Sequence, residues 1–241
     1  MKILITNDDG IGAEGIRALC EYAKGLGDIT LIAPKTEQSG MSQAIQFTHP
    51  MEIKLCDTGM GIRAYSVDST PADCVRFGLD GLKEKFDLVL SGINRGVNLG
   101  ADIVYSGTVG AVLEAGRHGL PAIALSTYPD TLKEAVAELD SVLEYFRSNE
   151  LLSHCPLYNV NIPPRAKGFR ITKQGSPYFS DEFIRLGEDL YQQTGSILPD
   201  REPDNPELDT VALGDGYISI TPLAVTRTSR EAYEKLSKLN K

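Results

Sequence analysis

The sequence is poor in tryptophan, histidine and cysteine. Tryptophan is absent, and the 241 residues include only three histidines and four cysteines. The cysteines Cys20, Cys56, Cys74 and Cys155 form no C-x-x-C pair and lie in apolar neighbourhoods, which favours structural thiols in a reducing compartment over zinc ligands or disulfides. The histidines are scattered, and His118 near the end of a predicted helix is better explained by the helix dipole than as a catalytic base.

Long apolar runs and an excess of positive charge are also missing. No apolar run approaches the roughly 18 residues of a membrane span. The N-terminus has one lysine before a short strand-like run that ends at Asp8, unlike a secretory signal peptide. We therefore expect a cytoplasmic protein with no membrane partner. The formal net charge of −9 disfavours binding to a nucleic-acid duplex, which needs a basic surface. An anionic substrate would have to be held by a local feature, such as a metal ion or a helix N-terminus.

Strand-like and helix-like segments alternate over the first 150 residues. This rhythm predicts an α/β fold with a doubly wound, mostly parallel, Rossmann-like sheet that carries helices on both faces. Short apolar runs predict strands at 2–6, 28–34, 86–92 and 121–126, and amphipathic or capped segments predict helices at 12–27, 70–82, 106–119 and 130–148.

Two parts of the chain depart from this rhythm. Residues 44–67 consist of two extended runs around a glycine-rich turn, which predicts an inserted β-hairpin. Residues 175–209 mix aromatics with proline, glycine and acids and predict an extended arm, followed by a late strand and a C-terminal helix capped by Thr228 or Ser229. We divide the chain into a catalytic core, residues 1–170, and a segment 171–241 that completes the core and an oligomer interface.

Two adjacent carboxylates, Asp8 and Asp9, directly follow the first predicted strand. Ligands of α/β sheets bind outside the carboxyl ends of the strands. Neighbouring carboxylates there raise each other's pKa, and a hard divalent cation such as Mg²⁺, Mn²⁺ or Ca²⁺ removes the repulsion. A pair of helix caps explains the same two residues equally well, so this stretch alone leaves both interpretations open.

The next glycines, at positions 10, 12 and 15, spell G-x-G-x-x-G between a predicted strand and a helix, the fingerprint of dinucleotide binding. Two features oppose that interpretation. The carboxylate pair would face the pyrophosphate, and the second strand ends in Ala33, Pro34 and Lys35 instead of the acid that binds the ribose.

P-loop, nucleophile-elbow and H-E-x-x-H motifs are absent from the sequence.

Further polar residues follow the second and third strands. Ser39 lies in the loop after the second strand, where a hydroxyl can complete an oxygen coordination sphere, although a turn serine explains it when taken alone. The third strand leads into a loop that is rich in glycine and contains Asn94 and Asn98. Long loops of this kind at a strand's carboxyl end are usually functional, and Asn94 can offer a carbonyl oxygen to a cation.

Ser106, Gly107 and Thr108 then begin a helix. Hydroxyls and free N–H groups at a helix N-terminus suit a phosphate. A plain helix cap explains Ser106 or Thr108 but not the preceding asparagine loop. A metal held by oxygen ligands beside a phosphate site is the arrangement that hydrolyses phosphate esters.

Several blocks resemble the SurE family of survival proteins, which are metal-dependent 5′/3′-nucleotidases. They include ILITNDDGIGAEGI, APKTEQSG, STPADCV, DLVLSGINRGVNLGADIVYSGTVGAVLEA, GLPAIALS, YNVNIP and GYISITPL. The resemblance implies a SurE-type fold, a homodimer or homotetramer built with the arm and the C-terminal segment, and one divalent cation per subunit, Mg²⁺ or Mn²⁺. It implies metal ligands at Asp8, Asp9, Ser39 and Asn94, catalytic roles for Asp8, Asp9 and Asn94, and substrate contacts from Asn98, Ser106, Gly107 and Thr108.

The expected reaction is attack of a metal-activated water on a nucleoside monophosphate. Asp8, first off the strand, is the better candidate for base or orienting group, although the sequence leaves this open. Two other functions remain: a non-catalytic nucleotide-binding sensor, and a dinucleotide-dependent oxidoreductase that uses the glycines. Two blocks differ from the family pattern. The block KTEQSGMSQAIQF lacks the threonine-rich ending that is usual in the family, and the chain lacks an acid expected after Thr210. Neither difference touches the metal residues, but both can alter substrate preference.

Overall fold

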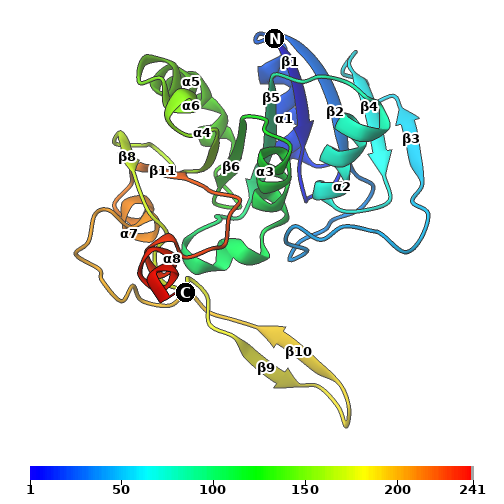
Figure 1. Ribbon diagram of the computed structural model, residues 1–241. Coiled ribbons are helices and arrows are strands. Elements are labelled where there is room, and N and C mark those ends of the chain that lie inside the picture. Colours follow the sequence, from blue (N-terminus) through cyan, green and yellow to red (C-terminus); the bar gives the residue numbers. More distant parts are fainter. Residues whose placement is uncertain (240–241) are drawn as a thin grey trace.

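A nine-stranded mixed sheet organises the computed structural model, which describes residues 1–239 (Figure 1). The strand order is β3-β4-β2-β1-β5-β6-β7-β11-β8. Within this sheet only β3–β4 and β7–β11 pair antiparallel, so the predicted doubly wound, mostly parallel sheet is confirmed. The strands are β1 (Lys2–Thr6), β2 (Asp28–Pro34), β3 (Ile53–Cys56), β4 (Arg63–Val67), β5 (Leu88–Arg95), β6 (Ala122–Thr127), β7 (Leu157–Ile162), β8 (Phe169–Ile171) and β11 (Ile218–Pro222).

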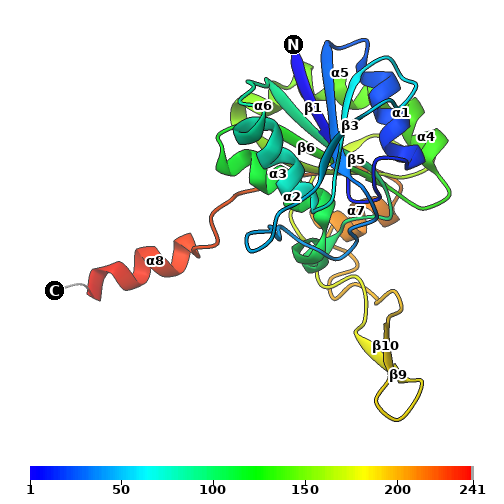
Figure 2. The same cartoon turned by 90° about the vertical axis from the view of Figure 1, so that its right-hand side faces the viewer.

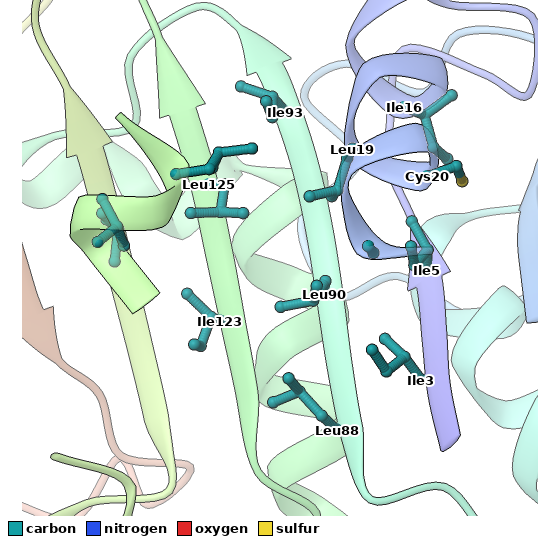
Figure 3. Packing of buried hydrophobic residues seen from close by; sticks show 14 of the residues in the cluster. Ile3, Ile5, Ile16, Leu19, Cys20, Leu88, Leu90, Ile93, Ile123 and Leu125 are labelled. Atoms are coloured by element: carbon teal, nitrogen blue, oxygen red, sulfur yellow. The ribbon is translucent and has the colours of Figure 1, made fainter. Parts of the chain in front are cut away.

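Helices cover both faces of the sheet, and alternate residues of β1 supply both cores. Ile3 and Ile5 lie beneath α1 (Figure 3), in the cluster that α5 also joins, whereas Leu4 belongs to the cluster on the other face with residues of α2 and α3. The helices are α1 (Glu14–Ala23), α2 (Pro71–Arg76), α3 (Gly107–Arg117), α4 (Leu132–Ala137), α5 (Leu139–Ser148), α6 (Leu151–His154), α7 (Asp209–Gly214) and α8 (Arg230–Leu236), with a π-turn η1 (Phe77–Gly81) and 3₁₀ turns η2 (Gly100–Tyr105) and η3 (Ser237–Leu239).

The inserted hairpin is present but shorter than predicted. Strands β3 and β4 pair antiparallel, and β4 joins the main sheet parallel to β2. Residues 44–52 form no strand, and polar groups of Ala44 and Gln46 bond to Thr70 and Asp73 at the start of helix α2 instead. The Ala44 carbonyl accepts from the Thr70 hydroxyl at 2.6 Å, and the Gln46 N–H donates to Asp73 at 2.6 Å.

Two predicted elements differ in extent. The single helix predicted for 130–148 is two helices, α4 and α5, separated at Glu138, and the break lets α5 turn Leu139, Val142 and Phe146 into the core. Strand β5 was expected to end at Gly92 but continues to Arg95 and pairs with β6 again after an irregularity. Asn94 therefore lies at the end of a strand and not in the loop.

Two segments project from the sheet domain (Figure 2). One is a hairpin of β9 (Glu182–Arg185) and β10 (Tyr191–Thr194), which lies in the predicted arm. The other is α8, which begins at the predicted cap Ser229; the last residues of that predicted helix, 240–241, lie outside the described residues. Helix α7 and strand β8 were not predicted. No helix of residues 1–239 is long and apolar enough to cross a membrane, and the four cysteines are free thiols.

The fold brings the predicted site to one place. Strand β1 lies between β2 and β5, where the strand order changes direction. In such sheets the carboxyl ends of the strands at this switch point border the ligand crevice. Asp8 follows β1, Ser39 follows β2 and Asn94 ends β5, so these three residues converge on one edge of the sheet.

Candidate functional site

Asp8 is held against the first turn of α3. Its side chain is 4% exposed; the Thr108 N–H donates to one carboxylate oxygen at 3.0 Å, and the Thr108 hydroxyl donates to the other at 2.5 Å. A Cβ on Gly107 would lie 2.9 Å from the Asp8 Cβ, so only glycine allows this approach. Asp8 therefore caps α3 from a distant strand, whereas α1, the helix that follows it, has no side-chain cap at Ala13.

The carboxylate pair carries more negative charge than its surroundings balance. Burial raises the pKa of Asp8, although hydrogen bonds from Thr108 act in the opposite direction. Burial also raises the pKa of Asp9, and the charge of Asp8 raises it further. The backbone N–H of Arg95 approaches Asp9 at 3.4 Å, but the Arg95 guanidinium pairs with Glu14 at 3.2 Å. A bound cation would supply the missing positive charge.

A cleft of about 250 Å³ joins the predicted residues of several loops. It is lined by Asp8, Ser39, Asn94, Asn98 and Ser106, together with other residues, whereas Asp9, Gly107 and Thr108 lie outside the lining. The fold thus gathers predicted residues that lie far apart in the chain, from Asp8 to Ser106. Their convergence at the carboxyl-terminal edge of the sheet is the central feature of the candidate site.

The donor atoms of the cleft suit a hard cation. The Asn94 side-chain nitrogen donates to the Gly96 carbonyl at 2.7 Å, which leaves Oδ1 as the free oxygen. The Ser39 hydroxyl is exposed and donates to Glu37 at 2.7 Å, so its lone pairs remain available. Among residues 1–239 no group of three or more His, Cys, Asp or Glu side chains is arranged for a metal. A cation here would therefore need the neutral oxygens of Ser39 and Asn94 besides the carboxylate pair, a donor set of the kind that Mg²⁺ and Mn²⁺ accept.

Asn98 is fixed by buried polar residues that the sequence analysis missed. Its N–H donates to Asn161 at 2.8 Å, its side-chain nitrogen donates to Ser126 at 2.8 Å, and its carbonyl accepts from Asn159 and Asn161 at 2.8 Å each. All three partners are fully buried on β6 and β7. Two asparagines at alternate positions of an otherwise apolar strand were the signal available in the sequence, because they point to the same face.

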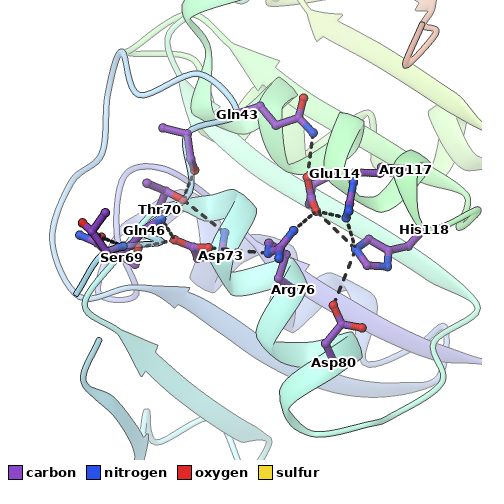
Figure 4. A network of polar contacts seen from close by, with 12 residues as sticks. Gln43, Gln46, Ser69, Thr70, Asp73, Arg76, Asp80, Glu114, Arg117 and His118 are labelled. Atoms are coloured by element: carbon purple, nitrogen blue, oxygen red, sulfur yellow. Dashed lines mark hydrogen bonds and ion pairs between the residues drawn. The ribbon is translucent and has the colours of Figure 1, made fainter. Parts of the chain in front are cut away.

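The loop that carries Ser39 is anchored to helices α2 and α3 (Figure 4). Gln43 donates to the buried carboxylate of Glu114 at 2.8 Å, and Arg76 donates to the same group at 3.1 Å. The Gln46 N–H donates to Asp73 of α2 at 2.6 Å. These contacts replace regular secondary structure between β2 and β3, and they fix the wall of the cleft formed by Ser39 and Gly40.

Two of the three glycines after β1 serve turning and packing. Gly10 has a φ of +97°, which favours glycine. A Cβ on Gly15 would lie 1.9 Å from the Ile93 carbonyl oxygen, so glycine lets α1 lie directly on β5. Around Gly12 no atom lies within 4 Å of a built Cβ, so packing does not require glycine there. A dinucleotide site is therefore not needed to explain Gly10 and Gly15.

The fold and this site define an α/β protein with a carboxylate-containing cleft at the switch point of a parallel sheet, beside a helix N-terminus. The family model described as "Survival protein SurE" matches residues 3–181. The chain belongs to the SurE family, as its motifs indicated.

Relatives and a solved structure match nearly the whole chain. The chain is 38% identical to the protein named 5′-nucleotidase SurE from Thermosipho melanesiensis, over 98% of this chain and 96% of that one. It is 37% identical to the protein of the same name from Legionella pneumophila, over 99% and 97%. The crystal structure of the SurE protein from Aquifex aeolicus superposes with a TM-score of 0.83 at 31% identity and covers 100% of both chains.

Proposed function

We propose that this protein is a divalent-metal-dependent phosphomonoesterase that hydrolyses nucleoside 5′- and 3′-monophosphates to nucleoside and phosphate. The names of its relatives support the 5′ activity. The observation that carries the proposal is the adjacent pair of Asp8, which is buried and lines the cleft, and Asp9, which is partly buried beside it; the pKa of each is raised. A structural pair of caps would not need both carboxylates, because only Asp8 bonds to a helix N-terminus.

In this proposal Asp8, Asp9, Ser39 and Asn94 hold one Mg²⁺ or Mn²⁺ per subunit. When bound, the cation neutralises charge on the phosphoryl group and lowers the pKa of a water molecule. Asp8, Asp9 and Asn94 are the catalytic residues. Both oxygens of Asp8 accept hydrogen bonds from Thr108, so we assign to Asp8 the role of an orienting group. Within residues 1–239, the Asp9 carboxylate has a single backbone contact, the longer one to Arg95. Asp9 is therefore the carboxylate better able to accept a proton.

The substrate's phosphate is held by Asn98 and by the first turn of α3. The Ser106 oxygen accepts from the Val109 N–H at 3.1 Å, so its hydroxyl hydrogen is free to donate into the cleft. Asn98 uses one side-chain hydrogen for Ser126 and retains the other. Gly107 and Thr108 act through Asp8, which they hold against the helix N-terminus.

The protein also assembles into a homodimer or homotetramer in this proposal. The hairpin β9–β10 exposes large apolar side chains, among them Phe183, and α8 has no buried residue. Exposed apolar surface on projecting segments usually meets a partner.

Phosphate release from a panel of nucleotides, with chelator and with metals added back, tests the activity. We expect release only when a divalent cation is present. A sensor would bind nucleotides without releasing phosphate, and an oxidoreductase would instead titrate with a nicotinamide dinucleotide. Either of these results would overturn the proposal.

A further inference from the structure

The cleft extends beyond the residues assigned to metal and phosphate. Its remaining lining includes the apolar and aromatic residues Val97, Leu99, Tyr105 and Phe179, besides the carboxylates Asp102 and Asp181. None of these apolar and aromatic side chains can hold a phosphate or a hard cation. This part of the cleft therefore calls for a different portion of a ligand, one with an apolar face.

Phe179 and Asp181 come from the beginning of the arm, far in sequence from the other lining residues, and the backbone of Phe179 is firmly fixed. The Asp102 carboxylate of η2 accepts the N–H groups of Tyr178 and Phe179 at 2.8 Å each. The buried Asp209 accepts from Gly100 at 2.9 Å and from Gly175 at 2.8 Å. Two carboxylates thus fasten the root of the arm to the rim of the cleft.

The Phe179 side chain is only partly covered. It packs edge-to-face on Tyr178, with ring centroids 4.9 Å apart at 84°, yet the residue is 45% exposed. Tyr105, which also lines the cleft, is 60% exposed. An exposed aromatic ring on a fixed backbone is a platform for a flat ligand, because bases stack on such rings.

Polar groups on different elements favour one orientation of a nucleotide. Ser106, at the N-terminus of α3, lines the cleft, and the partial positive charge of a helix N-terminus favours an anion. The root of the arm contributes Asp181 to the same lining, and this carboxylate repels a phosphate but can accept a hydrogen bond from an amino group or a hydroxyl. The other arm-side carboxylate in the lining, Asp102, already accepts the N–H groups of Tyr178 and Phe179. A phosphate is therefore favoured at α3 and a base at the arm.

We propose that Phe179, with Tyr105 and Asp181, forms the nucleobase subsite of this cleft, so that the arm sets the preference for nucleotides over other phosphate esters. This inference rests on the proposed function. It assigns to the root of the arm a role in substrate selection that is separate from assembly.

The test compares a purine nucleoside 5′-monophosphate with ribose 5-phosphate, which has the same phosphate and sugar but no base. Phe179→Ala should raise KM for the nucleotide about tenfold with little change in kcat, and should leave KM for ribose 5-phosphate unchanged. Phe179→Tyr keeps an aromatic face and should restore the parent value. Phe47→Ala serves as the matched control, because Phe47 is 87% exposed and lies outside the cleft lining.

Binding of the free nucleoside, measured by calorimetry, gives a readout that does not depend on turnover, and it should weaken in Phe179→Ala by a similar factor. Thermal melts and light scattering establish that the variant is folded and assembled like the parent. If Phe179→Ala changes KM for both substrates alike, or for neither, the subsite is elsewhere while the phosphatase proposal stands. If the parent releases phosphate from neither substrate in the presence of metal, the proposed function itself fails.

Discussion

At the scale of single residues, the two carboxylates of the site differ in what they contact, so their substitutions should differ too. Asp9→Asn removes a charge that is repelled by Asp8, and stability without metal should stay the same or rise. Asp8→Asn places an amide where both oxygens accept hydrogen bonds, and stability should fall by roughly 1–3 kcal/mol. Both variants should lose nearly all phosphatase activity and most of the metal-dependent rise in melting temperature.

Thermal melts with and without Mn²⁺ or Mg²⁺, beside a phosphate-release assay, measure all of these effects. A parent melting temperature that no divalent ion changes, together with active Asn variants, would exclude the metal site. It would leave Asp8 as a helix cap alone.

Thr108 offers a second test at this scale, since its hydroxyl bonds to Asp8 and it lies outside the cleft lining. Thr108→Val keeps the shape and the backbone N–H but removes a hydrogen bond to a charged group, which should cost about 1.5–3 kcal/mol. Metal affinity should fall as well, because Asp8 loses a fixed orientation. Thr108→Ser is the control and should keep most of both properties. Calorimetric titration with Mn²⁺ measures the affinity, and unchanged affinity in Thr108→Val would contradict the coupling.

The sequence allowed the convergence of Asp8, Ser39 and Asn94 to be predicted, because parallel strands place their carboxyl ends on one edge. It did not allow the contacts to be predicted. The bonds from Thr108 to Asp8 join residues 100 positions apart. Asn159 and Asn161 mark a polar face of their strand, but nothing in that pattern identifies Asn98 as their partner. Such pairings depend on strand order and register, which no local pattern contains.

At the scale of elements, Glu114 links α2, α3 and the Ser39 loop (Figure 4). Burial alone would raise its pKa, but hydrogen bonds from Gln43 and Arg76 and the charges of Arg117 and Arg76 outweigh burial and leave the pKa below its ordinary value. A carboxylate with a lowered pKa stabilises the fold at neutral pH. That contribution is lost as the pH falls from the ordinary carboxylate range through the lower value in the folded state.

Glu114→Gln should therefore be less stable than the parent at pH 7, by roughly 1–3 kcal/mol, and the difference should shrink as the solution is acidified below about pH 4.5. Urea unfolding at several pH values measures this difference. Glu144→Gln is the control, because Glu144 is exposed on α5, and it should change the stability much less than Glu114→Gln does. A constant difference at every pH would show that the charge of Glu114 is not responsible.

The boundaries of the helices and strands also show where tertiary packing overrides the preference of the local sequence. The sequence pattern of 130–148 predicts one continuous helix, but the helix is interrupted at Glu138, because α5 buries Leu139, Val142 and Phe146. Strand β5 continues beyond Gly92, where the sequence predicts a loop to begin, because β6 supplies strand-pairing partners for Asn94 and Arg95. Tertiary pairing decides such boundaries, whereas the hydrophobic period decides which elements exist.

At the scale of the whole molecule, the projecting hairpin and α8 bury little against their own chain (Figure 2). Phe183 is 68% exposed, and Tyr233 of α8 is 61% exposed. A hairpin of two strands is marginal alone in water, and so is a helix of 7 residues. Both segments should therefore be stabilised by other copies of this chain, in a closed dimer or tetramer.

Light scattering at micromolar concentration should give the mass of a dimer or tetramer for the parent. Phe183→Glu and Tyr233→Glu each place a charge in the expected interface and should shift the mass toward the monomer, since a buried unpaired charge is costly. Lys54→Glu, an equally exposed change on the outer strand β3, is the control and should keep the parent mass. Limited proteolysis reports the arm directly, because a hairpin released from its partner should be cut faster. A monomeric parent whose arm resists protease would show that the hairpin is stable alone, and the exposed side chains would then need another explanation.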